Sequence, residues 1–391
     1  MKKRLFNFGE KRGGKNFLDG TFTLTGAIIG AGILGLPYVF SKSGFLIGTF
    51  WLVVLGILML FIHLYMGEVI LRTNESHQLT GYAEKYLGKY GKWAMIFAMI
   101  FGIYSALIAY LIGEGQSISY IVFGSEKYAV VFAFLFWLVM TMLLREGLKG
   151  LKKVESWGVF IILALIIGIF IYFTPQINIQ NLSYNNAGLF FFPLGTVLFA
   201  LLGFSSIPEV GRIMKYDKQR LKKALIIGTI IPVIAYFLFT LAFVGALGME
   251  IKEVATISSG KVIAFLGIFT MLTSYFVLSF ALKDMFIIDL KFKKKSSFWL
   301  VSVLPLALYI LVSLFDLLDF KMVLGIGGVV AGGLTGILIL LMNYKAKKYS
   351  DRNPEYWIKN NFVIIFIVSL LLILAIIIEL GLLDKIVEMV R

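Results

Sequence analysis

Residues 25–38 read Thr25-Gly-Ala-Ile-Ile-Gly-Ala-Gly-Ile-Leu-Gly-Leu-Pro-Tyr38. This stretch is apolar enough to lie inside a membrane, yet it contains four glycines and one proline. Relative to alanine, a glycine costs about 1 kcal/mol and a proline about 3 kcal/mol in the interior of a helix. The stretch therefore predicts a helix that is interrupted partway along its length.

A second stretch has the same arrangement. Residues 198–209 read Leu198-Phe-Ala-Leu-Leu-Gly-Phe-Ser-Ser-Ile-Pro-Glu209. In both stretches a glycine precedes a proline by five residues, Gly32 before Pro37 and Gly203 before Pro208. Close packing of helices through small residues is an alternative explanation for the glycines of the first stretch. Packing alone does not explain the matched spacing, so we favour two interrupted helices.

The composition indicates the class of protein. Of the 391 residues, 59% are apolar and 15% are charged, and the mean hydropathy is +0.91. A soluble domain carries about 25% charged residues, so a soluble, disordered, collagen-like or coiled-coil chain is excluded. The sequence has no cysteine, which excludes disulfides, thiolate metal sites and a cysteine nucleophile.

Eleven apolar stretches are long enough to cross the roughly 30 Å core of a bilayer as helices. They cover residues 17–40, 43–71, 93–122, 128–145, 154–174, 187–211, 221–247, 258–282, 297–315, 321–342 and 361–382. We therefore expect an all-α integral membrane protein with 11 transmembrane helices. The first stretch is too long for a cleavable signal peptide and runs directly into the second.

The distribution of positive charge predicts the orientation. With the N-terminus in the cytoplasm, the N-terminal tail and every second connector hold 30 of the 37 lysines and arginines. Cytoplasmic segments of membrane proteins are enriched in these residues. We therefore expect a protein of the cell membrane whose N-terminus is cytoplasmic and whose C-terminus is extracytoplasmic. The net charge of +15 then reflects this topology and contact with anionic membrane lipid, so no nucleic-acid partner is expected.

The two interrupted stretches are the first and the sixth of the eleven. This spacing gives the two halves opposite orientations in the membrane, as in an inverted repeat of five helices plus five. We expect a cytoplasmic tail at 1–16, a first repeat at 17–174, a second repeat at 187–342 and an additional helix at 361–382. An interrupted helix exposes N–H groups that attract a carboxylate and C=O groups that attract an ammonium. Two facing interruptions therefore suit an amino acid zwitterion.

The chain resembles the amino acid/auxin permease family, and within it the aromatic amino acid permeases. This family belongs to the amino acid–polyamine–organocation superfamily, which has the LeuT-type fold. The resemblance rests on residues 30–37, on Glu68, on the run Gly81-Tyr-Ala-Glu-Lys-Tyr-Leu-Gly-Lys-Tyr-Gly-Lys-Trp93 and on residues 272–284. It implies an amino acid transporter with discontinuous helices one and six that works by alternating access.

The resemblance also implies a substrate site. The family's carboxylate-binding turn corresponds to Gly30, Ala31 and Gly32. Its sixth-helix interruption corresponds to Ala200, Leu201, Gly203 and Phe204. Carbonyl groups there would hold the amino group, and the Phe204 ring would cover the side chain.

A sodium site follows from the same resemblance. It corresponds to the carbonyls of Gly26, Ile29 and Thr270 and to the hydroxyls of Thr273 and Ser274. Oxygen ligands of this kind suit Na⁺. The alternative for the two hydroxyls is a hydrogen bond to the preceding turn of their own helix. The superfamily's second sodium site is not expected, because Ile33 stands where that site uses an asparagine.

Aromatic amino acid permeases are regarded as proton-coupled, so H⁺ is the alternative coupling ion. Glu114 and Glu209 lie within apolar stretches, where an ionisable residue predicts a function. The alternatives are a hydrogen bond to a neighbouring helix for Glu114 and helix N-terminal capping for Glu209. Some proton-coupled relatives place a lysine of the fifth helix in the sodium position, but this chain has lysines only at the inner edge of that helix. We assign no function to His63 or His77, which have no metal-ligand partner at helical spacing.

The sequence therefore predicts a secondary active symporter of neutral amino acids, aromatic or branched-chain by resemblance, driven by Na⁺ or H⁺. An amino acid or amine exchanger, a uniporter and a transporter-like nutrient sensor are alternatives. The sequence shows no nucleotide-binding loop, metal cluster or Ser/His/Asp set, so an enzyme is not expected. We expect no cofactor and no obligate protein partner.

Overall fold

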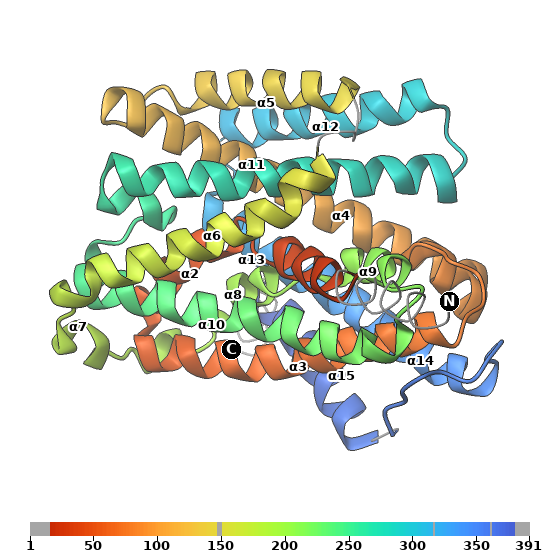
Figure 1. The fold of residues 1–391 in the computed structure, drawn as a ribbon. Helices are drawn as coiled ribbons and strands as arrows, with labels where there is room; N and C mark the ends of the chain where they lie inside the picture. The colour runs from red at the N-terminus through yellow and green to blue at the C-terminus, as the bar shows by residue number, and fades with distance from the viewer. Residues whose placement is uncertain (1–15, 147–150, 316, 360–361, 380–391) are drawn as a thin grey trace, which may run out of the picture.

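The computed structural model describes residues 16–146, 151–315, 317–359 and 362–379. In these ranges the fold is helical, apart from connecting segments and an isolated bridge between Gly44 and Asn185. The long helices run side by side (Figure 1). The end of the bundle on the left of Figure 1 carries the short helix α7 (Ile179–Ser183), and we call it the α7 end. The opposite end carries α9 (Ile207–Ile213), and we call it the α9 end.

Eight helical spans of the described residues are long and apolar enough to cross a membrane, or nine when a bent pair is counted as one span. The eight are α3 (Phe45–Leu71), α4 (Leu79–Phe123), α6 (Leu151–Phe173), α8 with α9 (Leu194–Ile213), α10 (Leu221–Leu247), α11 (Lys261–Asp284), α12 (Lys294–Leu314) and α13 with α14 (Phe320–Lys348). The bent pair is Asn16–Ile28 with α2 (Gly32–Ser43). The chain is therefore a multi-pass membrane protein.

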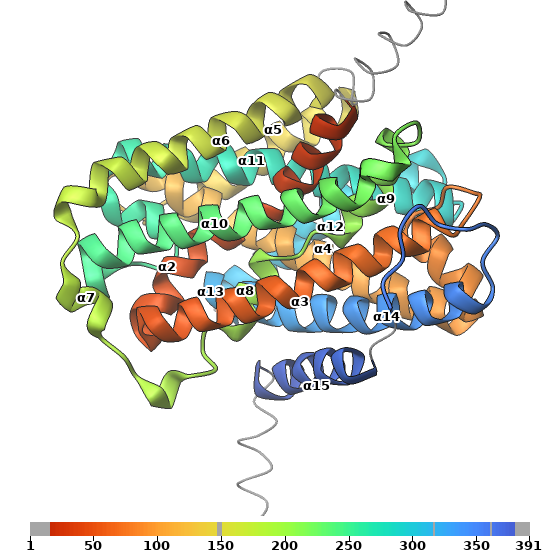
Figure 2. The same ribbon diagram turned by 60° about the horizontal axis from the view of Figure 1, so that its bottom comes forward.

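Two further apolar helices lie outside this count. α5 (Ala129–Glu146) packs against α4 and α12, and α15 (Phe362–Glu379) packs against α14 on the outside of the bundle (Figure 2). A helix is thus present at each of the eleven expected ranges. Eight or nine of these helical segments are long and apolar enough to count as membrane spans. Of the expected tail at 1–16, residues 1–15 lie outside the described residues, as do the last residues of the expected range 361–382.

The first helix is interrupted where its glycines and proline predict. One helix ends at Ile28, and α2 begins at Gly32 with its axis turned by 51°. Pro37 lies inside α2, within the first two turns. The interruption therefore falls on residues 29–31, next to the glycines and not at the proline itself.

The sixth expected helix is interrupted in the same way. α8 (Leu194–Ala200) ends at Ala200, and Gly203 leaves the helical path with φ −148° and ψ 0°. A single turn at Phe204–Ser206 leads into α9, which has Pro208 in its first turn. A proline costs no backbone hydrogen bond at that position, because the first N–H groups of a helix have no partner inside it.

α4 begins at Leu79 and not at residue 93 as expected. Gly88 bends the helix, with φ +72° in the left-handed region that favours glycine. In the sequence, residues 79–87 resemble a polar connector and not part of a membrane-spanning helix. Because of the bend, Leu79 reaches the centre of the bundle, where it lines a cavity described below.

A buried carboxylate organises the α9 end. Glu68 has no exposed surface, and its Oε1 lies 2.8 Å from Arg72 Nη2. Its Oε2 lies 3.7 Å from Lys347 Nζ and accepts the Ile358 N–H at 3.1 Å. Glu68 is thus paired with basic residues. It holds the segment 349–359, which connects α14 to α15, against the end of α3.

Candidate functional site

The two interruptions meet in the middle of the bundle. Gly32, the first residue of α2, lies against Ala200, the last residue of α8. A Cβ atom on Gly32 would lie 2.4 Å from the Ala200 Cα, so this approach requires glycine. The last C=O groups of a helix and its first N–H groups have no partner inside the helix. The crossing therefore brings free donors and free acceptors to one place.

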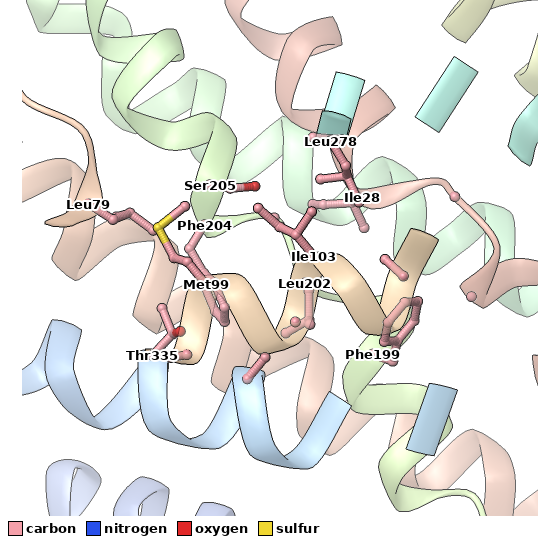
Figure 3. Close-up of a pocket in the computed structure, with 18 of the residues that line it drawn as sticks. Ile28, Leu79, Met99, Ile103, Phe199, Leu202, Phe204, Ser205, Leu278 and Thr335 are labelled. Atoms are coloured by element: carbon pink, nitrogen blue, oxygen red, sulfur yellow. The ribbon is translucent and has the colours of Figure 1, made fainter. Parts of the chain in front are cut away.

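A small cavity of about 80 Å³ opens beside this crossing (Figure 3). From the expected substrate set, Gly30, Gly32, Gly203 and Phe204 line the cavity. Ala31, Ala200 and Leu201 are buried next to them and are not among the lining residues. The remaining walls come chiefly from α4, and Met99, Ile103 and Thr335 point toward the cavity (Figure 3). The lining is mostly apolar, which suits the side chain of an apolar ligand.

A second, more polar cavity adjoins the first toward the α9 end. The two cavities share Ala27, Ser205 and Leu278. Glu209, Arg212 and Asp284 also line the second cavity. Glu209 stands in the first turn of α9, as the capping alternative expects. The polar cavity gives the central cavity an approach from the α9 end.

Tyr110 of α4 connects the first interruption with α11. Its hydroxyl is hydrogen-bonded to Ser274 and to the main chain of Ala31, and it lines the central cavity. A Cβ atom on Gly30 would lie 2.8 Å from the Tyr110 hydroxyl oxygen. The hydroxyl therefore lies beside the turn that the family resemblance assigns to a carboxylate.

The residues expected to bind sodium come together in part. Gly26, Thr273 and Ser274 line one small cavity, and Ser274 Oγ lies 3.4 Å from the carbonyl oxygen of Ile29. These oxygens are of the type that Na⁺ binds. Thr270 is not among the lining residues, and its carbonyl oxygen, the expected ligand, accepts the Thr273 hydroxyl at 3.0 Å.

Thr273 adopts the alternative arrangement expected for its hydroxyl. Its Oγ1 lies 3.0 Å from the Thr270 carbonyl oxygen and 3.1 Å from the Phe269 carbonyl oxygen, both in its own helix. α6, the fifth expected helix, contributes Gly158 and Val159 to the same small cavity. The side chains of Lys152 and Lys153, the lysines of that helix, lie outside the described residues.

Glu114 is fully buried in α4. Neither of its carboxyl oxygens has a hydrogen-bond partner among the described residues, and the same holds for the Ser117 hydroxyl nearby. The expected alternative, a hydrogen bond to a neighbouring helix, is therefore not observed for Glu114. Burying an unpaired charge is costly. Because no hydrogen bond within the described residues offsets this cost, the carboxyl group has no evident structural role.

His63, to which the sequence assigns no function, lies behind the second interruption. Its ring packs edge-on against Phe204, with ring centroids 5.9 Å apart, and its Nδ1 lies 2.9 Å from Thr229 Oγ1. The Thr229 hydroxyl donates its own hydrogen to the Leu225 carbonyl at 2.8 Å. The hydrogen-bond network therefore assigns the donor role to His63 Nδ1. His63 thus contacts Phe204, a lining residue, without lining the cavity itself.

The tryptophan/tyrosine permease family model matches residues 14–262 of the chain. This range contains both interruptions, Tyr110 and Glu114. The chain belongs to the tryptophan/tyrosine permease family.

Curated relatives of this permease are transport proteins. The chain is 27% identical over 244 residues to Glutamine transporter 2 of Aliivibrio fischeri and 26% identical over 254 residues to Tyrosine-specific transport system 1 of Haemophilus influenzae. It is 22% identical over 279 residues to the low affinity tryptophan permease of Proteus vulgaris. These matches cover 60%, 61% and 68% of this chain and 62%, 61% and 67% of the relatives, so the chain spans about three fifths of the first two. The relatives place the permease with transport proteins and not with enzymes.

A solved structure shows the same fold. The crystal structure of MhsT in complex with L-phenylalanine superposes with a TM-score of 0.66 at 16% sequence identity. The superposition covers 93% of this chain and 97% of MhsT. The permease therefore has the LeuT-type fold.

Sequence reasoning missed the cavity walls that come from α4 and from Ala331 and Thr335. A stripe of small residues on α4, at Ala98, Gly102 and Ala106, was a usable signal, because all three line the cavity at four-residue spacing. A Cβ atom on Gly102 would lie 2.5 Å from the Ala331 Cβ. Ala331 lies in a π-helical turn, Gly328–Gly332, that separates α13 (Phe320–Gly327) from α14 (Gly333–Lys348).

Glu253 and Asp319 form a hydrogen-bonded carboxyl pair outside the membrane-spanning helices. Glu253 Oε2 accepts the Lys321 N–H at 3.3 Å, and Asp319 Oδ1 accepts the Met322 N–H at 2.7 Å. Burial and the neighbouring Asp319 carboxylate raise the pKa of Glu253 to about 7. Glu253 therefore carries a proton at mildly acidic pH.

Glu253→Gln is expected to weaken the pH dependence of stability between pH 5 and 8. The pKa of Glu253 is raised in the folded protein, so the stability that its proton provides is lost as the pH rises toward about 7. A glutamine amide donates to Asp319 at every pH. Thermal unfolding in detergent should therefore show a melting temperature a few degrees above wild type at pH 8 and closer to it at pH 5. The exposed Glu250→Gln is the control, and an unchanged pH slope in the Glu253 variant would contradict the prediction.

Proposed function

We propose that this permease is an ion-coupled symporter that carries neutral amino acids across the cell membrane by alternating access. The observation that supports this most is the crossing of two interrupted helices beside an apolar cavity. Free N–H groups suit a carboxylate and free C=O groups suit an ammonium. The apolar cavity between them suits a side chain.

In the proposed site, different residues bind the carboxylate, the amino group and the side chain of the amino acid. The turn at Gly30, Ala31 and Gly32, with the Tyr110 hydroxyl, takes the carboxylate. Carbonyl groups at Ala200 and Leu201 take the amino group. Gly203 and Phe204 cover the side chain, and Phe204 is supported by His63.

An aromatic side chain is the proposed preference. The relatives named above are a glutamine transporter, a tyrosine-specific transport system and a tryptophan permease. Met99, Ile103 and Phe204 give the cavity apolar walls, which favours an aromatic side chain over the polar side chain of glutamine.

The proposed topology has 11 spans in the amino acid/auxin permease pattern of the amino acid–polyamine–organocation superfamily. Residues 17–174 and 187–342 form the inverted repeat, and 361–382 adds a helix. The excess of lysine and arginine in connectors at the α9 end supports a cytoplasmic location for that end. The α7 end and the C-terminus are then outside the cell.

Uptake into proteoliposomes tests this function. Labelled tryptophan, tyrosine, phenylalanine and glutamine are supplied with a Na⁺ gradient, then with a pH gradient, then with unlabelled amino acid inside. A symporter accumulates label only under an ion gradient. Transport that needs internal amino acid would identify an exchanger, and binding without flux would identify a sensor.

The coupling ion is Na⁺, bound by Gly26, Ile29, Thr270, Thr273 and Ser274, or H⁺, carried by Glu114 or Glu209. Under sodium coupling, Thr273→Ala is expected to raise the Na⁺ concentration for half-maximal uptake by at least on the order of tenfold. The variant removes one hydroxyl that lines the small cavity. Thr240→Ala is the control, because Thr240 is buried and its hydroxyl has no hydrogen-bond partner among the described residues. Unchanged Na⁺ dependence in Thr273→Ala would reject the sodium site.

A further inference from the structure

One hydroxyl group lies between the two interruptions. Tyr236, in α10, has no exposed surface. Its hydroxyl oxygen lies 2.7 Å from the carbonyl oxygen of Ile28 and 2.8 Å from the carbonyl oxygen of Ala200. Ile28 ends the first helical segment and Ala200 ends α8. The same side chain therefore contacts the C-terminal end of both broken helices.

One hydroxyl hydrogen faces two carbonyl oxygens here, so donors are fewer than acceptors. A tyrosine hydroxyl donates one hydrogen bond, so it satisfies one of the two carbonyls at a time. The C-terminal end of a helix carries partial negative charge, and two such ends converge here. The two carbonyl ends therefore favour the binding of a further group that carries N–H donors and a positive charge.

Tyr236 itself does not line the central cavity, whereas Ile28 does. Ala200 touches Gly32 of the cavity lining through main-chain atoms. The hydroxyl therefore acts on the cavity only through the main chain at the two interruptions. Without it, the two carbonyl ends would lose the one side-chain donor that fixes them relative to each other.

We infer that Tyr236 is a positioning residue for the substrate amino group, and that its hydroxyl holds the carbonyl ends of both interruptions in the arrangement that binds an ammonium. This inference rests on the proposed amino acid transport. It adds a residue from α10 that takes part in recognition without touching the substrate. It also makes the placement of the two interruptions interdependent, because one hydrogen-bond donor serves both.

Tyr236→Phe tests the inference through the discrimination between an amino acid and its deaminated analogue. Binding of L-tryptophan and of indole-3-propionate is measured on purified protein in detergent. We expect the variant to bind L-tryptophan on the order of tenfold more weakly, which is the loss of about one hydrogen bond. Binding of indole-3-propionate, which has no amino group, should change little, so the ratio of the two affinities falls by a similar factor.

Tyr65→Phe is the matched control. Tyr65 is buried, and its hydroxyl has no hydrogen-bond partner among the described residues. Its removal should leave both affinities and their ratio unchanged. Tyr236→Met, which also lacks the donor, replaces Tyr236→Phe if the latter is not recovered as folded protein.

Two results would overturn the inference while leaving the proposed function in place. One is a Tyr236 variant with an unchanged affinity ratio. The other is a variant that loses affinity for both ligands equally, which indicates general damage to the site. If the wild-type protein bound L-tryptophan no better than indole-3-propionate, recognition of an amino group would be absent. The proposed amino acid transport would then fail together with the inference.

Discussion

Gly32→Ala is expected to lower the initial rate of amino acid uptake on the order of 100-fold. The added methyl group would lie 2.4 Å from the Cα and 2.6 Å from the Cβ of Ala200, so the two interrupted helices must move apart. A displacement near 1 Å at a site that depends on geometry costs on the order of 100-fold in rate. The measurement is uptake of labelled substrate into proteoliposomes that contain equal amounts of folded protein.

Gly35→Ala in the same helix is the control for this substitution. Its methyl group would meet the terminal Cδ1 of Leu324 at 2.8 Å, and a flexible side chain can move aside where a backbone cannot. Uptake by Gly35→Ala should therefore remain close to wild type. Equal rates for the two alanine variants would show that transport does not depend on close contact at the crossing.

In a proton-driven transporter, Glu114→Gln is expected to abolish the accumulation of substrate under a pH gradient. Glutamine keeps the size of the side chain but carries no proton. Glu114 is buried, and its carboxyl oxygens have no hydrogen-bond partner among the described residues, so the substitution removes no observed contact. Exchange of external for internal amino acid should continue, because it moves no net proton.

The same substitution at Glu209 is the comparison for Glu114. Glu209 lines the polar cavity in the first turn of α9 and contributes to a helix N-terminus. Retained accumulation in Glu209→Gln and lost accumulation in Glu114→Gln would assign the proton to Glu114. Normal accumulation in Glu114→Gln would exclude Glu114 as the proton carrier.

The two interruptions could be predicted because their cause is local. A glycine-rich stretch with a nearby proline is a poor helix in any surroundings, and membrane burial does not remove that cost. The family resemblance predicts that both interruptions belong to one substrate site, and the structure brings Gly32 and Ala200 into contact. The start of α4 was missed because residues 79–87 carry charged side chains and read as a connector.

Apart from the stripe of small residues at Ala98, Gly102 and Ala106, the cavity walls could not be derived from the sequence. Lipid and protein interior are equally apolar, so an apolar helix does not reveal which of its faces meets protein. Tyr104 and Tyr110 illustrate this, since they lie six residues apart in α4. Tyr110 lines the cavity, whereas the Tyr104 hydroxyl donates to the Leu300 carbonyl at 3.1 Å.

The ion pairs of Glu68 limit how this end of the protein can evolve. Its charge is balanced by Arg72, Lys347 and the Ile358 N–H, which come from three separate parts of the chain. Removing one partner of a buried ion pair costs roughly 3–5 kcal/mol. Replacing Glu68, Arg72 or Lys347 by a neutral residue is therefore costly unless a second of these residues changes with it. The loop that joins α14 to α15 should consequently tolerate fewer insertions and deletions than its surface location suggests.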